Sequence, residues 1–176
     1  MSADQKNLRG RAPCPPYFAG KDTPMQQSPD IEIRSGPWDI VEIQDFLRNA
    51  VIPMRLATRG EKWPLVQSLW FLFEGSALWF CTQQDSVVAR RLESNPRCAF
   101  EVAGDNPPYR GVRGRGVASL DTELAAGLLE RLLSHYQVDP ESSLASWLQS
   151  RLDNEVAIRI DNLVLSSWDY SSRMSR

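Results

Sequence analysis

Four side chains that suit phosphate binding lie close together in the segment Leu78–Pro96. Thr82 ends a predicted buried strand, Ser86 precedes a predicted helix, and Arg90 and Arg91 lie on that helix. The first turn of a helix leaves backbone N–H groups free, and nearby hydroxyl and guanidinium groups add further donors. This segment therefore predicts a pocket for a phosphorylated cofactor rather than a self-contained catalytic triad.

Each of these residues also has an ordinary structural explanation. Ser86 would serve as a plain N-cap, and Arg90 and Arg91 as the solvated face of a helix. Thr82 is a common strand residue. For Ser86, Arg90 and Arg91 taken alone, the structural explanation is the preferred one.

A second group of arginines follows in the segment 109–116. Arg113 and Arg115 are two residues apart on a predicted strand and therefore share a face. Arg110 falls on the opposite face unless a bulge at Gly111 re-aims it. Two like charges on one face repel unless an anion or carboxylates offset them. Both an anionic ligand and cross-strand glutamates would explain the pair.

Composition excludes several other kinds of site. His135 is the only histidine, which argues against a multi-histidine metal site, and no metal is expected. Cys14, Cys81 and Cys98 form no CxxC motif and are expected to be reduced thiols. The net charge of −2 argues against a general nucleic-acid or membrane-surface partner. No apolar run is long enough to span a bilayer and no secretory signal is visible, so we expect a cytoplasmic protein.

The elements that must position these residues are mostly strands. Residues 1–36 are polar and are expected to form a flexible arm, whereas residues 37–176 form one domain. Strands are predicted at 54–58, 65–73, 77–82, 97–102, 109–120 and 155–168, and helices at 38–50, 86–94, 121–136 and 143–152. Sequential strands joined by short turns favour an antiparallel barrel over a parallel sheet. The predicted fold is mainly β with helices, a six-stranded antiparallel β-barrel with peripheral helices.

Five short segments follow one another in a recognisable order. They are RLAT at 55–58, PLVQSLWF at 64–71, GSALWFCT at 75–82, SVVARRLESNP at 86–96 and YRGVRGRG at 109–116. In this order and spacing the chain resembles the pyridoxamine 5′-phosphate oxidase-like family of FMN-binding split β-barrels, over about residues 38–168. The resemblance implies a split barrel that forms a homodimer, with FMN bound in a groove between the subunits.

The resemblance also implies roles for individual residues. In chain order, from the flavin ring to the phosphate and then to the segment from the neighbouring subunit, the implied cofactor-binding residues are Arg55, Leu56, Gln67, Ser68, Trp70, Thr82, Ser86, Arg90, Arg91, Arg110 and Arg113. Trp168 has two interpretations. It would either shape the substrate side of the flavin or pack in the fold or dimer interface.

Two departures from the family bear on the activity. Many relatives carry a phosphate-binding lysine where this chain has Val88, and the vitamin B6 oxidases carry an Arg- and His-containing segment where it has Leu165–Tyr170. The expected activity is FMN-dependent oxidoreduction, with hydride transfer at flavin N5 to or from an unidentified small molecule. One alternative is a deazaflavin-dependent reductase, with Arg113 and Arg115 near its longer acidic tail. The other is a flavin- or haem-binding protein without turnover.

Overall fold

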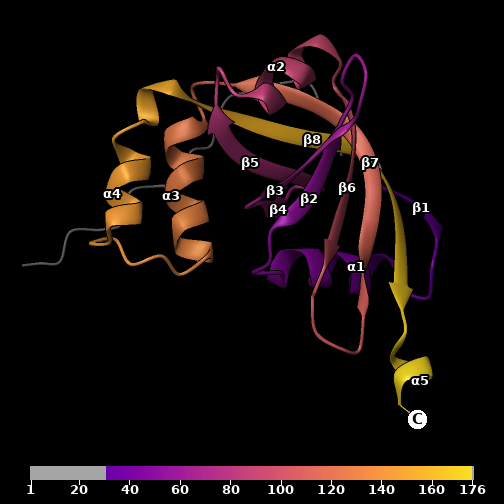
Figure 1. Ribbon diagram of the computed structural model, residues 1–176. Helices are drawn as coiled ribbons and strands as arrows, with labels where there is room; N and C mark the ends of the chain where they lie inside the picture. The colour runs from indigo at the N-terminus through magenta and orange to yellow at the C-terminus, as the bar shows by residue number, and fades with distance from the viewer. Residues whose placement is uncertain (1–30, 176) are drawn as a thin grey trace, which may run out of the picture.

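The computed structural model describes residues 31–175, and its centre is one curled sheet with helices around it (Figure 1). The strands are β1 (Glu32–Ser35), β2 (Met54–Thr58), β3 (Leu65–Leu69), β4 (Leu72–Glu74), β5 (Ala77–Gln83), β6 (Arg97–Ala103), β7 (Arg110–Asp121) and β8 (Glu155–Asp169). The helices are α1 (Ile40–Asn49), α2 (Val87–Ser94), α3 (Ala125–His135), α4 (Ser143–Gln149) and α5 (Ser171–Met174), with a 3₁₀ turn at Leu152–Asn154. The greater part of the predicted arm, residues 1–30, and Cys14 lie outside the described residues.

The strands form a single sheet in the order β3-β2-β6-β7-β8-β5-β4, and β1 is added to β8. Only the β1–β8 pairing is parallel among the described strands, and all the others are antiparallel. The long strand β8 pairs with β7, β5 and β1, so it joins the two halves of the sheet. A mainly β fold with peripheral helices is confirmed, and the curled sheet is consistent with a split barrel.

The predicted count of six strands is not confirmed, because the sheet has eight. Strand β1 was not predicted, since its four residues are mostly polar and all exposed. The segment predicted as one strand over 65–73 is two strands with different partners. Residues 65–69 pair with β2, whereas residues 72–74 pair with β5, and Trp70 and Phe71 lie between them.

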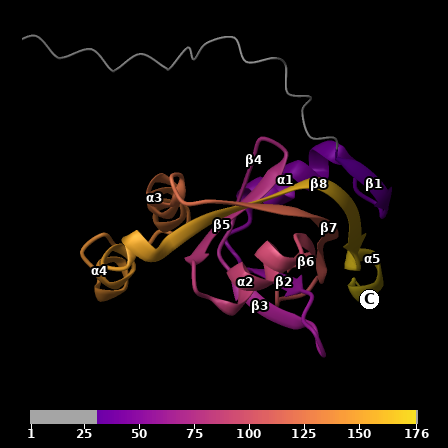
Figure 2. The same cartoon turned by 90° about the horizontal axis from the view of Figure 1, so that it is seen from above.

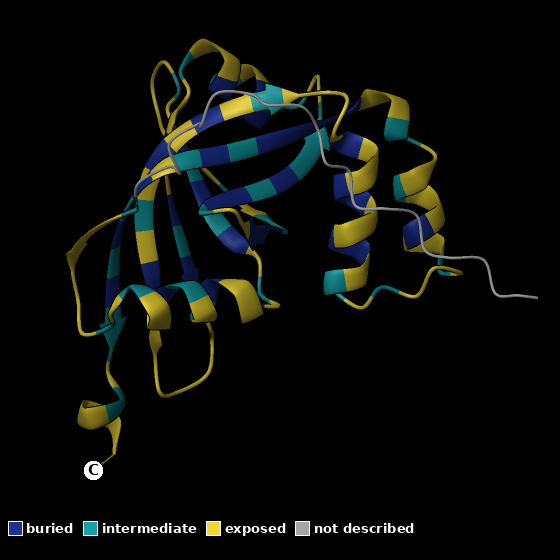
Figure 3. Ribbon diagram, turned by 180° about the vertical axis from the view of Figure 1, so that it is seen from behind, coloured by how far each residue is buried: buried dark blue, intermediate teal, exposed yellow. Residues whose placement is uncertain are grey.

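The main core fills the inside of the curled sheet, and two helices close its ends (Figure 1). More buried and less buried residues alternate along strands such as β2, as the burial colours in Figure 3 show. Helix α1 contributes Ile43 and Leu47, and begins at a capping box formed by Asp39 and Glu42. Helix α2 contributes Val88 and Leu92. Both helices are thus held by apolar faces against the open ends of the barrel.

Helices α3 and α4 stand beside the barrel (Figure 2). Leu128 and Leu132 of α3 pack against Leu72 and Ala157 of the sheet in a second, smaller core. No helix within residues 31–175 is long and apolar enough to cross a membrane.

Candidate functional site

Helix α2 and the loop between β2 and β3 enclose a basic hollow of about 740 Å³, here called the α2 hollow. Arg59 and Lys62 line it from the loop, and Arg90 and Arg91 line it from the helix. The only carboxylate among its described lining residues is that of Glu61. Its size suits a small ligand, and its charge suits an anion. Of the four residues predicted to bind phosphate, Arg90 and Arg91 line this hollow.

The guanidinium group of Arg91 packs against Gly60 of the β2–β3 loop. A Cβ atom at Gly60 would lie 2.6 Å from Arg91 Nη2, so glycine leaves the space that the guanidinium occupies. Arg91 Nη1 is buried and has no hydrogen-bond partner among the described residues. An unpaired buried donor costs about 1–3 kcal/mol. A phosphate oxygen at this point would remove that cost, so the residues present fit a phosphorylated cofactor.

Thr82 lies near the end of β5 and Ser86 at the start of α2, and neither lines the α2 hollow. The Ser86 Oγ accepts a hydrogen bond from the backbone N–H of Ala89 at 3.1 Å and is the N-cap. The Thr82 hydroxyl donates to Ser86 Oγ at 3.2 Å. Val88, at the position of the family lysine, is buried in the main core. The positive charge on this helix is therefore supplied by Arg90 and Arg91.

A row of polar side chains crosses the outer face of the sheet, the side of β2, β6 and β7 that points away from the main core. Ser68 lies opposite Arg55, Arg55 opposite Glu101, Glu101 opposite Arg113, and Arg113 opposite Ser166. Directly opposed residues on neighbouring strands share a face and lie about 5 Å apart. The fold thus brings three of the predicted site residues onto one surface.

Arg55 is fixed in place by acceptors of its own chain. Its Nη1 donates to the carbonyl oxygen of Ala103 at 3.2 Å, and its Nη2 donates to Asp105 Oδ1 at 2.8 Å. Glu101 Oε1 lies 3.9 Å from Nη1. Because both ion pairs are partly exposed, they add little stability and chiefly orient the guanidinium.

Trp168 lies over Gly111, near the start of β7. A Cβ atom at Gly111 would lie 2.8 Å from Trp168 Cζ2, and the guanidinium carbon of Arg113 lies 6.0 Å from the ring centroid. This is the outer limit of a cation–π contact. Trp168 and Arg113 therefore form one edge of the outer face. Arg110 is not part of this edge, since it begins β7 and lies opposite Asp169 at the end of β8.

Three other predicted residues do not present their side chains on the outer face. Leu56 is 1% exposed in the main core. Gln67 lies opposite Leu56, and its Oε1 is buried without a hydrogen-bond partner in the part of the chain that is described. Trp70 stacks on Tyr136, with ring centroids 4.8 Å apart. Leu56 and Trp70 are thus used in packing, whereas Gln67 keeps a free acceptor.

The cysteines and possible metal ligands have ordinary structural surroundings. Burial raises the pKa of Cys81 and of Cys98 to about 12, so both are protonated and unreactive at neutral pH. Within residues 31–175 no three side chains of the metal-ligating types gather in one place.

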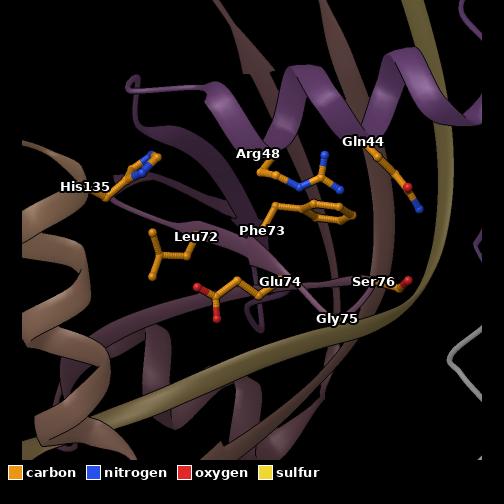
Figure 4. Close-up of a pocket in the computed structure, with 8 residues that line it drawn as sticks. All are labelled: Gln44, Arg48, Leu72, Phe73, Glu74, Gly75, Ser76 and His135. Carbon is orange, nitrogen blue, oxygen red and sulfur yellow. The ribbon is translucent and has the colours of Figure 1, made fainter. Parts of the chain in front are cut away.

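His135 lines a separate hollow of about 570 Å³ between α1, α3 and the β4–β5 hairpin (Figure 4). Its Nε2 lies 2.9 Å from the carbonyl oxygen of Ala50, so this nitrogen is the donor. Of the charged residues that line the hollow, Arg48 pairs with Asp45 and Glu74 pairs with Arg131. His135 therefore ties helix α3 to the backbone at the end of helix α1.

Arg59 and Lys62, which lie in the turn between β2 and β3, were not predicted as site residues. The fold brings that turn against α2, about 30 residues later in the chain. The available signal was the sequence Arg-Gly-Glu-Lys between two strands, with two cations beside a glycine.

The comparisons with known proteins agree with this fold. The family model described as pyridoxamine 5′-phosphate oxidase matches residues 41–160. No curated protein matches the chain. A conserved hypothetical protein from Mycobacterium tuberculosis aligns with a TM-score of 0.63 at 24% identity, covering 84% of this chain and 91% of that protein.

Two further solved structures are of proteins whose names mention a cofactor. A protein named as an F420 reductase aligns with a TM-score of 0.56 at 21% identity, over 66% of this chain and 90% of its own. An FAD-binding protein from Mesorhizobium loti aligns with a TM-score of 0.51 at 20% identity, over 70% and 88%. At these identities the structures show a shared fold. Since the family match spans more than half of the sequence, the chain belongs to the pyridoxamine 5′-phosphate oxidase family.

Proposed function

We propose that this protein is an FMN-dependent oxidoreductase that transfers hydride between the flavin N5 and a small-molecule substrate. The observation that carries the proposal is that Arg91, whose buried Nη1 has no hydrogen-bond partner among the described residues, lines a hollow together with three other cationic side chains. Family membership supports a flavin cofactor in general. The basic hollow favours one that carries a phosphate group.

FMN, when bound, supplies the redox chemistry, and the protein supplies binding, orientation and exclusion of water. Arg91 and Arg90 would hold the phosphate in the α2 hollow. Ser68 and the anchored Arg55 would contact the edge of the flavin ring from the outer face. Trp168 would cover the substrate side.

A homodimer is part of the proposal, because the outer face carries exposed apolar and small residues. Val66 is 62% exposed and lies opposite Ala57, which lies opposite Ala99. Trp63, in the adjoining loop, is 78% exposed. Exposed apolar surface of this kind is typical of an interface. A second copy on this face would bring its own strand β7 toward the flavin.

The phosphate assignment is tested by the double substitution Arg90→Ala with Arg91→Ala. FMN affinity should fall at least about tenfold, or roughly 1.4 kcal/mol, because charged hydrogen bonds are lost. Arg48→Ala on α1 removes a similar charge far from the α2 hollow and should leave the affinity unchanged. Unchanged FMN affinity in the double variant would exclude this phosphate site.

A deazaflavin in place of FMN is the alternative cofactor. Its support is the structural similarity to the F420 reductase and the presence of further arginines on the outer face. The mass of the cofactor released from the purified protein distinguishes the two.

A further inference from the structure

A second arginine cluster lies on the outer face of the sheet, around a hollow of about 260 Å³ that we call the arginine hollow. Arg113 and Arg115 line it from β7, and Arg34 lines it from β1. Ser166 of β8 adds a hydroxyl, and Val164 adds an apolar wall. Three arginines from two distant parts of the sequence thus line one hollow.

The arginine hollow has no internal source of negative charge. No carboxylate lines it, and none of its three arginines forms an ion pair within the described part of the chain. Glu101, the acid directly opposite Arg113, lies within ion-pair distance of Arg55 instead. Because like charges on one sheet face repel, a compensating anion is the simplest way to stabilise this arrangement.

Arg34 lies at an irregularity in the pairing of β1 with β8. Ile33 pairs with Leu165 and Ser35 pairs with Ser166, so Arg34 is an extra residue between two consecutive partners. A bulge of this kind re-aims a side chain. The Ser35 hydroxyl donates to Ser166 Oγ at 3.0 Å and ties β1 to the rim of the hollow.

The arginine hollow is separate from the α2 hollow. Strand β6 lies between β2, which leads into the α2 hollow, and β7, which carries Arg115. At about 4.8 Å between neighbouring strands, β2 and β7 are roughly 10 Å apart, which one phosphate group cannot bridge. The polar row on the outer face connects the arginine hollow to Arg55 and Ser68, the residues expected at the flavin ring.

We propose that Arg34, Arg113 and Arg115 form a second anion-binding site, which holds a multiply charged oxyanion of the substrate. A phosphate ester and a polycarboxylate share this chemistry. Assigning the anion to the substrate rests on the proposed flavin function, whereas anion binding itself does not.

Isothermal titration calorimetry of the full-length protein, with pyrophosphate and with citrate as probes, tests the site. At least one probe should bind to the wild type, and Arg34→Ala and Arg115→Ala should each weaken it by about tenfold. The probe that binds more tightly identifies the substrate class. Arg97→Ala is the matched control, since it removes an exposed arginine from the neighbouring strand β6. Arg97→Ala should leave the affinities for pyrophosphate and for citrate unchanged.

FMN affinity is measured in the same variants so that the two proposals can fail separately. Probe binding that depends on Arg34 and Arg115 in a protein that takes up no flavin would support the anion site and reject the flavin function. Absence of binding to both probes would overturn the site, as would an equal loss in Arg97→Ala. A tenfold loss of FMN affinity in Arg34→Ala would also overturn it, because the cluster would then belong to the cofactor.

Discussion

Replacing Arg91 by methionine should stabilise the cofactor-free protein. The side chains have similar length, but methionine removes the buried, unpaired Nη1 while keeping apolar contact with the surroundings. Leaving such a donor unpaired costs about 1–3 kcal/mol. Since Arg91 is only partly buried, the gain should lie near 1 kcal/mol. For a chain of this size, that gain corresponds to a rise in Tm of about 2–4 °C.

The same substitution should weaken the flavin complex. If a phosphate oxygen accepts from Nη1, Arg91→Met loses a charged hydrogen bond worth about 1.5–3 kcal/mol. The Kd for FMN should therefore rise by roughly ten- to 150-fold. The specific expectation is that the substitution raises stability and lowers FMN affinity. Replacing an arginine with a purely structural role would instead lower both or change stability alone.

Two measurements check this prediction on one preparation. Differential scanning calorimetry after removal of the cofactor gives the Tm, and quenching of flavin fluorescence during titration gives the Kd. Arg48→Met, at an exposed residue of α1, is the control and should change neither by much. A lower Tm together with an unchanged Kd would refute the view that Nη1 donates a hydrogen bond to the phosphate of bound FMN.

Other parts of the fold give three further predictions. Gly111→Val should displace the indole of Trp168, lower the unfolding free energy by about 1–3 kcal/mol and alter the tryptophan emission; an unaltered emission spectrum would mean that the ring does not lie on Gly111. Burial raises the pKa of Glu155, so the stability linked to this group is full below its ordinary pKa and is lost as the pH rises through the folded value. Glu155→Gln should therefore raise the unfolding free energy in urea at about pH 8 but not near pH 4, and equal changes at both pH values would contradict this reasoning. Cys81 and Cys98, with pKa values of about 12, should resist iodoacetamide in the native protein and react after unfolding, and native alkylation of either, detected by peptide mass spectrometry, would show that burial does not protect them.

Elements whose bounds depend on residues that are neighbours in the sequence were predicted well. The observed bounds of β2, Met54–Thr58, equal the predicted ones, because alternate residues there are buried. Ser86 caps α2 as expected. The predicted start of α3 at residue 121 is wrong, because Asp121 accepts hydrogen bonds from the N–H groups of Glu123 and Leu124 in a turn and the helix begins at Ala125.

The candidate site could be predicted only where its residues are neighbours in sequence. Arg90 and Arg91 lie on one helix, and Arg113 and Arg115 lie on one strand, so their spacing was visible. The contact of Arg91 with Gly60 depends on how a loop meets α2, and the position of Arg34 depends on an unpredicted strand. A bulge at Gly111 was the condition under which Arg110 would share a face with Arg113, whereas the register of β7 with β8 shifts between Arg115 and Val117.

The most direct test of the central claim is the visible absorption spectrum of the freshly purified protein, combined with mass spectrometry of whatever heat releases. The account predicts a flavin spectrum and the release of FMN. A colourless protein that also fails to bind added FMN would contradict it.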